Sequence, residues 1–306
     1  YAPLDPPVPG GTVATSFLPP APPQAPAKPD DTAAIIAIAN ASSIAHYDWH
    51  GRGTAPIGYT QGMALAFAQT YRRLKAGHPA AVEMAKANTG DDTHDAISWY
   101  NSNFAALGMT NDAPGADTLR HLFALMLGHG MRESSGIPWE GRDISASNVT
   151  SDTAEAGLFQ TSYNAHVCHP TFDLVMDEFL AGKVAGFSDT FAHGVKSGSS
   201  PNFGSGRGAA FQDLCKKQPA FSVESAAITI RNLRHHYGPY GNTQAQKAVE
   251  LRPEADAMFR AVQDYTARRR AMVSDSSVNR EIQLLRRVVR FTEPRGYEAP
   301  TLDWGK

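Results

Sequence analysis

One glutamate ends an apolar stripe of the sequence and is the side chain best suited to acid chemistry. Glu133 follows Met126 by seven residues and Leu119 by fourteen. Because seven residues make about two helical turns, the three side chains share one helix face. Partial burial of such a carboxyl disfavours its charged form, as a general acid requires. The alternative is a glutamate at a frayed helix end, solvated or paired with Arg132 or Arg142.

Two short motifs frame this glutamate. Residues 133–136 read ESSG, and residues 156–160 read AGLFQ. The pair resembles the goose-type lysozyme and soluble lytic transglycosylase superfamily, which places its catalytic glutamate before a serine and carries an AxGLMQ-like turn downstream. Phe159 stands where that family usually has methionine. The resemblance covers about residues 117–270, and it implies a lysozyme-like fold that cleaves β-1,4 bonds of peptidoglycan.

The resemblance assigns roles position by position. Glu133 becomes the general acid, and Ser134 supports its carboxylate or the helix end. The other substrate-binding candidates belong to the second motif or follow it directly: Gly157, Phe159, Gln160, Tyr163 and Asn164. Gly157 would let the backbone approach the saccharide because it has no Cβ, whereas Phe159 and Gln160 would contact sugar by stacking and hydrogen bonding.

Many members of the family also have a later tyrosine whose hydroxyl approaches the acid. The sequence HHYGPYGN offers Tyr237 and Tyr240 for this position. Tyr237 is the first choice, and the alternative is a tyrosine that only packs in the core.

A second carboxylate would distinguish hydrolysis from transglycosylation. An inverting hydrolase needs one roughly 6.5–9.5 Å from the acid to activate water. Lytic transglycosylases need none. Four candidates lie between the two motifs: Glu140, Asp143, Asp152 and Glu155. We expect Asp152 first and Asp143 second, although loop aspartates also cap turns. The abundance of acids slightly favours hydrolysis.

Hydrophobic periodicity predicts a mainly α fold. Helices are expected at 33–45, 60–75, 80–87, 93–107, 117–135, 171–180, 209–216, 223–236, 253–270 and 278–289. Residues 136–155 should form a loop with a small β-hairpin, and residues 182–208 a long surface loop. The expected organisation is a Pro-rich arm (1–29), a lysozyme-like catalytic domain with an additional N-terminal helical layer (30–270), and a C-terminal helix and tail (271–306).

Composition narrows the partners. The chain has 28 Lys and Arg against 30 Asp and Glu, without a basic block that would follow nucleic-acid phosphates. The apolar run at residues 122–127 is too short to cross a bilayer. The composition thus argues against nucleic acid and a membrane span. The resemblance implies a polysaccharide substrate, and we expect a monomer that needs no cofactor. Cys168 and Cys215 suggest one disulfide in a secreted or periplasmic protein, the alternative being two buried thiols.

Several other signals carry less weight. The HVCH cluster at residues 166–169 lacks the further ligands of a zinc site, so no metal is expected. His129 is interpreted as a core histidine with its hydrogen bonds satisfied. The Gly- and aromatic-rich segment 48–68 has no mechanism assigned. Competing functions are cleavage of chitin, chitosan or deacetylated peptidoglycan, and non-catalytic glycan binding.

Overall fold

In the computed structural model, the described residues are 31–142, 150–241 and 247–271. The expected arm at residues 1–29, Asp143 and the expected helix at residues 278–289 lie outside them. The described residues from Thr32 onward belong to one compact unit. Within these ranges, none of the helices combines the length and the hydropathy needed to cross a bilayer.

The described part of the chain is mainly helical, as the periodicity predicts. The elements are α1 (Asp31–Ala41), the 3-10 helix η1 (Ser43–His46), β1 (Asp48–Trp49), β2 (Gly53–Thr54), α2 (Ile57–Lys75), α3 (Pro79–Met84), α4 (Ala96–Trp99), α5 (Asn101–Ala106), α6 (Ala116–Ser134), the 3-10 helix η2 (Tyr163–Cys168), α7 (Thr171–Leu180), α8 (Ser188–Phe191), α9 (Gly206–Lys217), α10 (Pro219–Asn232), the 3-10 helices η3 (Arg234–His236) and η4 (Gly238–Tyr240), and a helix at 253–271.

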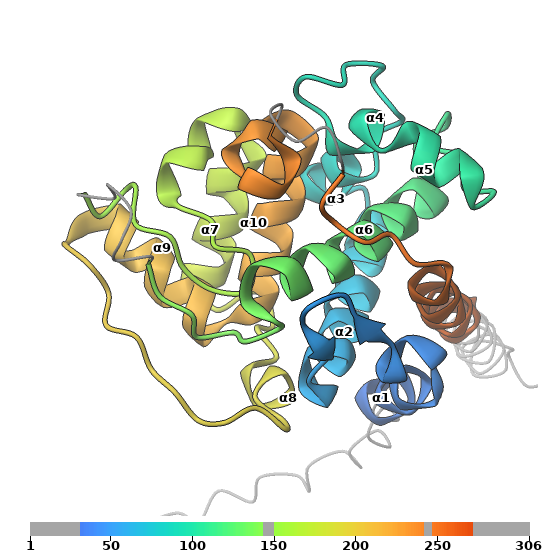
Figure 1. The fold of residues 1–306 in the computed structure, drawn as a ribbon, viewed down its shortest axis with the longest axis horizontal. Coiled ribbons are helices and arrows are strands. Elements are labelled where there is room, and N and C mark those ends of the chain that lie inside the picture. Colours follow the sequence, from blue (N-terminus) through green and yellow to red (C-terminus); the bar gives the residue numbers. More distant parts are fainter. Residues whose placement is uncertain (1–30, 143–149, 242–246, 272–306) are drawn as a thin grey trace, which may run out of the picture. The chain divides into compact units, whose positions relative to one another are not determined.

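Three long helices form the centre of this unit. α2, α6 and α10 contact one another pairwise, and Figure 1 shows α6 running between the elements that surround it. Each is buried along most of its length, so its sequence is apolar or small on nearly all sides rather than on one stripe. The N-terminal part of the chain therefore contributes a central helix, α2, to the same core as α6.

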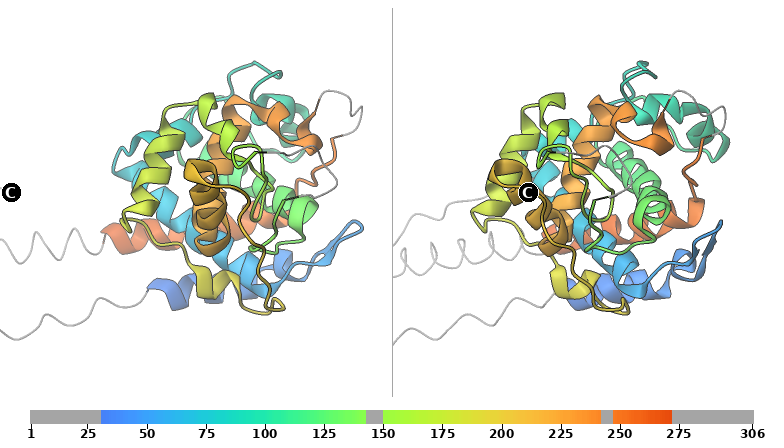
Figure 2. Two further views of the ribbon diagram at one scale, coloured as in Figure 1. Left: turned by 90° about the vertical axis from the view of Figure 1, so that its left-hand side faces the viewer. Right: turned by 60° about the vertical axis from the view of Figure 1, so that its left-hand side comes forward.

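Aromatic side chains join these helices to their neighbours. Phe67 of α2, Phe123 of α6 and Phe259 of the last described helix lie with ring centroids 5.1–5.8 Å apart. Each ring is fully buried, and burial of one phenylalanine contributes about 1.5–3 kcal/mol. This cluster fixes the last described helix against α2 and α6. The backbone of that helix can be followed by its red-orange colour in the two views of Figure 2.

The β-structure lies outside the region where it was expected. β1 and β2 form an antiparallel hairpin in which Asp48 faces Thr54 and Trp49 faces Gly53. The described residues of the 136–155 loop contain no strand. The centre of the predicted hairpin, residues 143–149, lies outside the described residues. Just after it, a single bridge pairs Ala156 with Thr161.

Candidate active site

Glu133 lies at the C-terminal end of α6, one residue before its last. Ser135 ends the helix in the left-handed conformation (φ 56°), and its N–H donates to Met131 O at 3.2 Å. Gly136 follows with φ 75°, a conformation that favours glycine. The Glu133 side chain keeps 19% exposure. The helix therefore presents one partly buried carboxylate where the chain turns away.

Two segments cross α6 just before this glutamate, where glycines leave room for them. Tyr59 of α2 packs against Gly130, where a Cβ would collide with the tyrosine hydroxyl, and this hydroxyl donates to Leu127 O at 2.9 Å. On another side, the carbonyl oxygen of Glu250 takes the space of a Cβ at Gly128. Close backbone approach of this kind requires glycine. The two crossings hold the last turns of α6.

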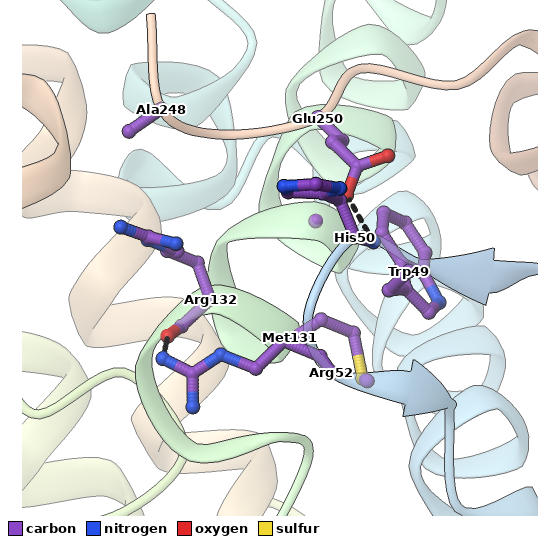
Figure 3. A pocket seen from close by; sticks show the side chains of 8 residues that line it. Trp49, His50, Arg52, Met131, Arg132, Ala248 and Glu250 are labelled. Carbon is purple, nitrogen blue, oxygen red and sulfur yellow. Dashed lines mark hydrogen bonds between the residues drawn. The ribbon is translucent and has the colours of Figure 1, made fainter.

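Arg52 completes the support of the helix end from the β1–β2 hairpin. Its guanidinium donates to the carbonyl oxygen of Arg132 and to Ser135 Oγ, the latter at 3.4 Å. The last carbonyls of a helix have no partner within it, so Arg52 satisfies one beside Glu133. Figure 3 shows this contact at the rim of a small pocket of about 50 Å³ that Trp49 also lines. The segment without an assigned mechanism thus scaffolds the catalytic candidate.

The two motifs are in direct contact. Ser134 Oγ donates to Leu158 O at 2.8 Å. The turn is fixed at its other side as well, because the Gly157 N–H donates to Glu140 O at 2.8 Å. The fold therefore brings residues 133–136 and 156–160 together, although 24 residues separate Ser134 from Leu158.

Gly157 is glycine for a reason other than the expected one. It is buried and has φ 75°, and a Cβ there would lie 2.9 Å from the Cβ of Cys215 and 3.1 Å from Ser222 Oγ. The absence of a Cβ lets the turn pack against the α9–α10 junction. Access for a saccharide is not needed to explain this glycine.

The expectation that Phe159 stacks on sugar is wrong in this structure. Its side chain has 0% exposure and packs on the ring of His129, with centroids 5.2 Å apart. Residues 156–159 are all buried, so the whole turn, including this ring, belongs to the core. Gln160 is partly exposed, with φ 48°, and its Nε2 donates to Gly157 O at 3.1 Å. Gln160 is therefore the residue of this motif that a ligand could reach.

The two tyrosine candidates, Tyr237 and Tyr240, differ in the hydrogen bonding of their hydroxyl groups. Tyr237 forms a 2.7 Å hydrogen bond between its hydroxyl and Thr161 Oγ1. The Tyr240 hydroxyl is buried without a hydrogen-bond partner among the described residues. Burial first, then the nearby ionisable groups that include Glu133, raises the pKa of Tyr240 well above its usual range. The Tyr240 hydroxyl, unlike that of Tyr237, is thus not engaged by another described side chain.

The remaining substrate-binding candidates lie around η2. Tyr163 is 7% exposed, and its hydroxyl accepts from Arg207 Nε at 2.9 Å, so it belongs to a surface network with Asp173. Asn164 is exposed, and its Oδ1 accepts from Ser162 Oγ at 2.7 Å. Neither contact leads to Glu133.

The described second-acid candidates have other neighbours. Asp152 is exposed, and its Oδ1 takes the space of a Cβ at Gly208, in the first turn of α9. A carboxylate is favourable at a helix N-terminus, so the capping alternative explains Asp152 directly. Glu140 is partly buried, and its backbone carbonyl holds Gly157. Asp143 lies outside the described residues.

The disulfide expectation is corrected by the structure. Cys168 and Cys215 are both free thiols. Cys168 contacts Thr229 and Cys215 contacts Ser222, two turns and about 10 Å apart along α10. Such positions do not suit the short Cα separation of a disulfide. Burial raises the pKa of Cys168 to about 11 and that of Cys215 further.

The histidines of the HVCH cluster have protein partners. His166 stacks on Tyr163 with centroids 4.5 Å apart, and His169 Nδ1 lies 2.8 Å from Thr171 Oγ1. In the part of the chain that the structure describes, no three His, Cys, Asp or Glu side chains are placed to hold a metal ion.

Comparison with known proteins finds no relative. No protein-family model, no curated protein and no solved structure matches this chain. The resemblance to goose-type lysozymes and lytic transglycosylases therefore depends on the two motifs alone.

Proposed function

We propose that this protein is a lysozyme-like glycosidase that cleaves β-1,4 bonds of peptidoglycan glycan strands, with Glu133 as the general acid. The observation that carries the proposal is the position of Glu133: a partly buried carboxylate at the end of a buried helix, joined through Ser134 to the second motif. General acid catalysis needs a carboxyl held in a fixed direction and partly shielded from water. Such a substrate places the enzyme in the periplasm or outside the cell.

A pocket lined in part by Trp139 supports a glycan ligand. It has a volume of about 440 Å³ and is lined by Trp139, Ser200 and Lys216, among others. The size is in the range of small-molecule sites, which combine aromatic surface with a few polar groups. Trp139 lies six residues after Glu133 in the sequence, and its ring offers the aromatic surface on which a sugar of the substrate would stack.

The test compares the full chain with Glu133→Gln on native peptidoglycan, de-N-acetylated peptidoglycan and chitin. Mass spectrometry identifies the soluble fragments. Glu254→Gln is the matched control, because Glu254 lies on the last described helix and pairs with Arg252. We expect release from peptidoglycan by the wild type and the control, and a loss of about 10²–10⁴-fold in Glu133→Gln.

The products also separate the alternatives. Reducing ends indicate hydrolysis, and 1,6-anhydro ends indicate a lytic transglycosylase. If Asp152→Asn retains full hydrolytic activity, Asp152 is not the second acid. Release that is equal in wild type and Glu133→Gln, or absent from every polymer, would reject the proposed mechanism.

A further inference from the structure

His129 is a buried polar side chain that the packing of the core does not explain. It lies one helical turn before Glu133 and has 0% exposure. Neither Nδ1 nor Nε2 has a hydrogen-bond partner among the described residues, so the sequence-based interpretation of a satisfied core histidine is wrong. Buried polar atoms almost always have a partner, and an exception calls for an explanation.

Three aromatic rings hold the imidazole in place. The ring centroids of Tyr237, Tyr240 and Phe159 lie 4.7, 4.8 and 5.2 Å from that of His129, and both tyrosines meet it edge to face. Tyr237 is itself fixed by its hydrogen bond to Thr161. A buried side chain packed on three rings has little freedom to change rotamer. The direction of the imidazole is therefore set by the core.

The imidazole points a nitrogen toward the acid. His129 Nε2 lies 3.7 Å from Glu133 Oε1, slightly beyond the length of a hydrogen bond. The glutamate is the more adaptable partner, because it is partly exposed whereas His129 is enclosed. Catalytic hydrogen bonds are often long in the absence of substrate and shorten in the complex. A small movement of the Glu133 side chain closes this contact.

We propose that His129 is the positioning residue of Glu133: its neutral imidazole, protonated on Nδ1, accepts a hydrogen bond at Nε2 from the protonated carboxyl. The contact holds the carboxyl in one direction and favours the form that can donate a proton. Because burying an unpaired charge is costly, the neutral ring is the form that suits this enclosed position. The inference rests on the proposed role of Glu133 as general acid.

The other groups that face His129 do not change charge in the working range. Glu133 approaches from α6, Tyr237 and Tyr240 from the segment after α10, and Phe159 from the second motif. Burial raises the pKa of both tyrosines well above their usual range. Glu133 is therefore the group facing the imidazole that can share a hydrogen bond with Nε2.

Two variants separate positioning from packing. His129→Phe keeps a ring of similar size but removes both nitrogens, and His129→Gln can place an amide near the Nε2 position. For His129→Phe we expect kcat to fall at least ~10-fold with KM unchanged, the loss of about one hydrogen bond. The alkaline limb of its pH profile should move to lower pH by about one unit. His129→Gln should recover most of the lost kcat and most of the shift in the pH profile. A purely structural role would leave the pH profile unmoved and the Gln variant no better than Phe.

A measurement without substrate keeps this inference distinct from the proposed function. The ring nitrogens of His129 are followed by ¹⁵N NMR from pH 4 to 9 in the wild type, in Glu133→Gln and in the control Glu254→Gln. We expect the His129 signals to change in Glu133→Gln alone. Identical titration curves in all three proteins would overturn the pairing, even if the two His129 variants fail to fold. A coupled pair in a protein that cleaves no glycan would instead reject the function and leave the pairing intact.

Discussion

Ser134 Oγ donates a hydrogen bond of 2.8 Å to the carbonyl oxygen of Leu158, so the last turn of α6 and the turn of the second motif are one structural unit. Ser134→Ala leaves this buried carbonyl without its donor, which costs about 1–3 kcal/mol. We expect a free energy of unfolding lower by that amount in urea titrations, and a weaker glycan-cleaving activity. Ser197→Ala, at an exposed loop position, should change neither. A Ser134→Ala variant as stable as wild type would show that the two motifs are held by other contacts.

Two glycines with similar backbone angles should respond differently to alanine. Gly157 has φ 75°, and a Cβ added there would lie 2.9 Å from the Cβ of Cys215. Gly182 has φ 65°, and a Cβ added there would meet no atom within 4 Å. Gly182→Ala carries only the left-handed strain of about 1 kcal/mol. Gly157→Ala adds overpacking of about 1–3 kcal/mol. Thermal unfolding of the two variants measures the difference, and equal losses would contradict the packing role of Gly157.

The free thiols make the stability of the protein independent of reductant. Without reductant, denatured protein should be alkylated at both Cys168 and Cys215, and dithiothreitol should leave Tm unchanged. In the native state, Cys168 is partly exposed with its pKa raised to about 11 by burial, so its reaction is slow. Cys215 is fully buried and should react only on unfolding. If neither cysteine of the denatured protein is alkylated until reductant is added, the two form a disulfide after all.

Glu224 should make the protein less stable as pH rises. It is fully buried on α10, where Arg73 Nη1 lies 2.7 Å from its carboxylate. Burial, which outweighs the attraction of Arg73, raises its pKa from 4.5 to about 7. The folded state then holds a proton that the unfolded state releases between pH 4.5 and 7. Over this window stability falls with pH, by about 3 kcal/mol in total.

Replacement of the Glu224 carboxyl tests the sign of this pH dependence of stability. Urea unfolding of Glu224→Gln and wild type at pH 5, 6, 7 and 8 should show the variant gaining stability relative to wild type as pH rises. Glu254→Gln is the control of opposite sign, because the hydrogen bond from Arg252 lowers the pKa of Glu254. The contribution of Glu254 to the free energy of unfolding is lost as pH falls. Parallel pH curves for wild type and Glu224→Gln would mean that Glu224 titrates normally.

Local periodicity predicts a helix well where its surroundings are the same along its whole length. α7 has the predicted bounds, Thr171–Leu180, because its apolar residues follow a helical period between a proline and a polar loop. The predicted helix at 93–107 is instead divided into α4 and α5 at Tyr100. The Tyr100 hydroxyl accepts from the Val249 N–H at 3.0 Å. A contact 149 residues away leaves no periodic signal in the sequence.

The candidate site was predictable only as far as its two motifs. The sequence indicated both motifs, and the structure joins them through the hydrogen bond from Ser134 to Leu158. The inward direction of the Phe159 side chain could not be predicted from the sequence, because a motif does not specify which side of a turn faces the core. The supports from Arg52 and Tyr59 were missed for a related reason. Their partners on α6 lie at least 67 residues away, so only the unusual density of glycine and aromatic residues at 48–68 signalled a role.

The segment around Glu250 also governs when the site can exist during biosynthesis. The Tyr47 hydroxyl donates to Glu250 at 2.8 Å across 203 residues, and the carbonyl of Glu250 crosses α6 at Gly128. A ribosome releases residues 47 and 128 long before residue 250, and contacts of such sequence separation form late because their loop-closure entropy is large. The support of this helix end by Glu250 thus forms only after residue 250 has been translated. A nascent chain that has not yet reached residue 250 lacks this support for the helix end that bears Glu133, the proposed acid.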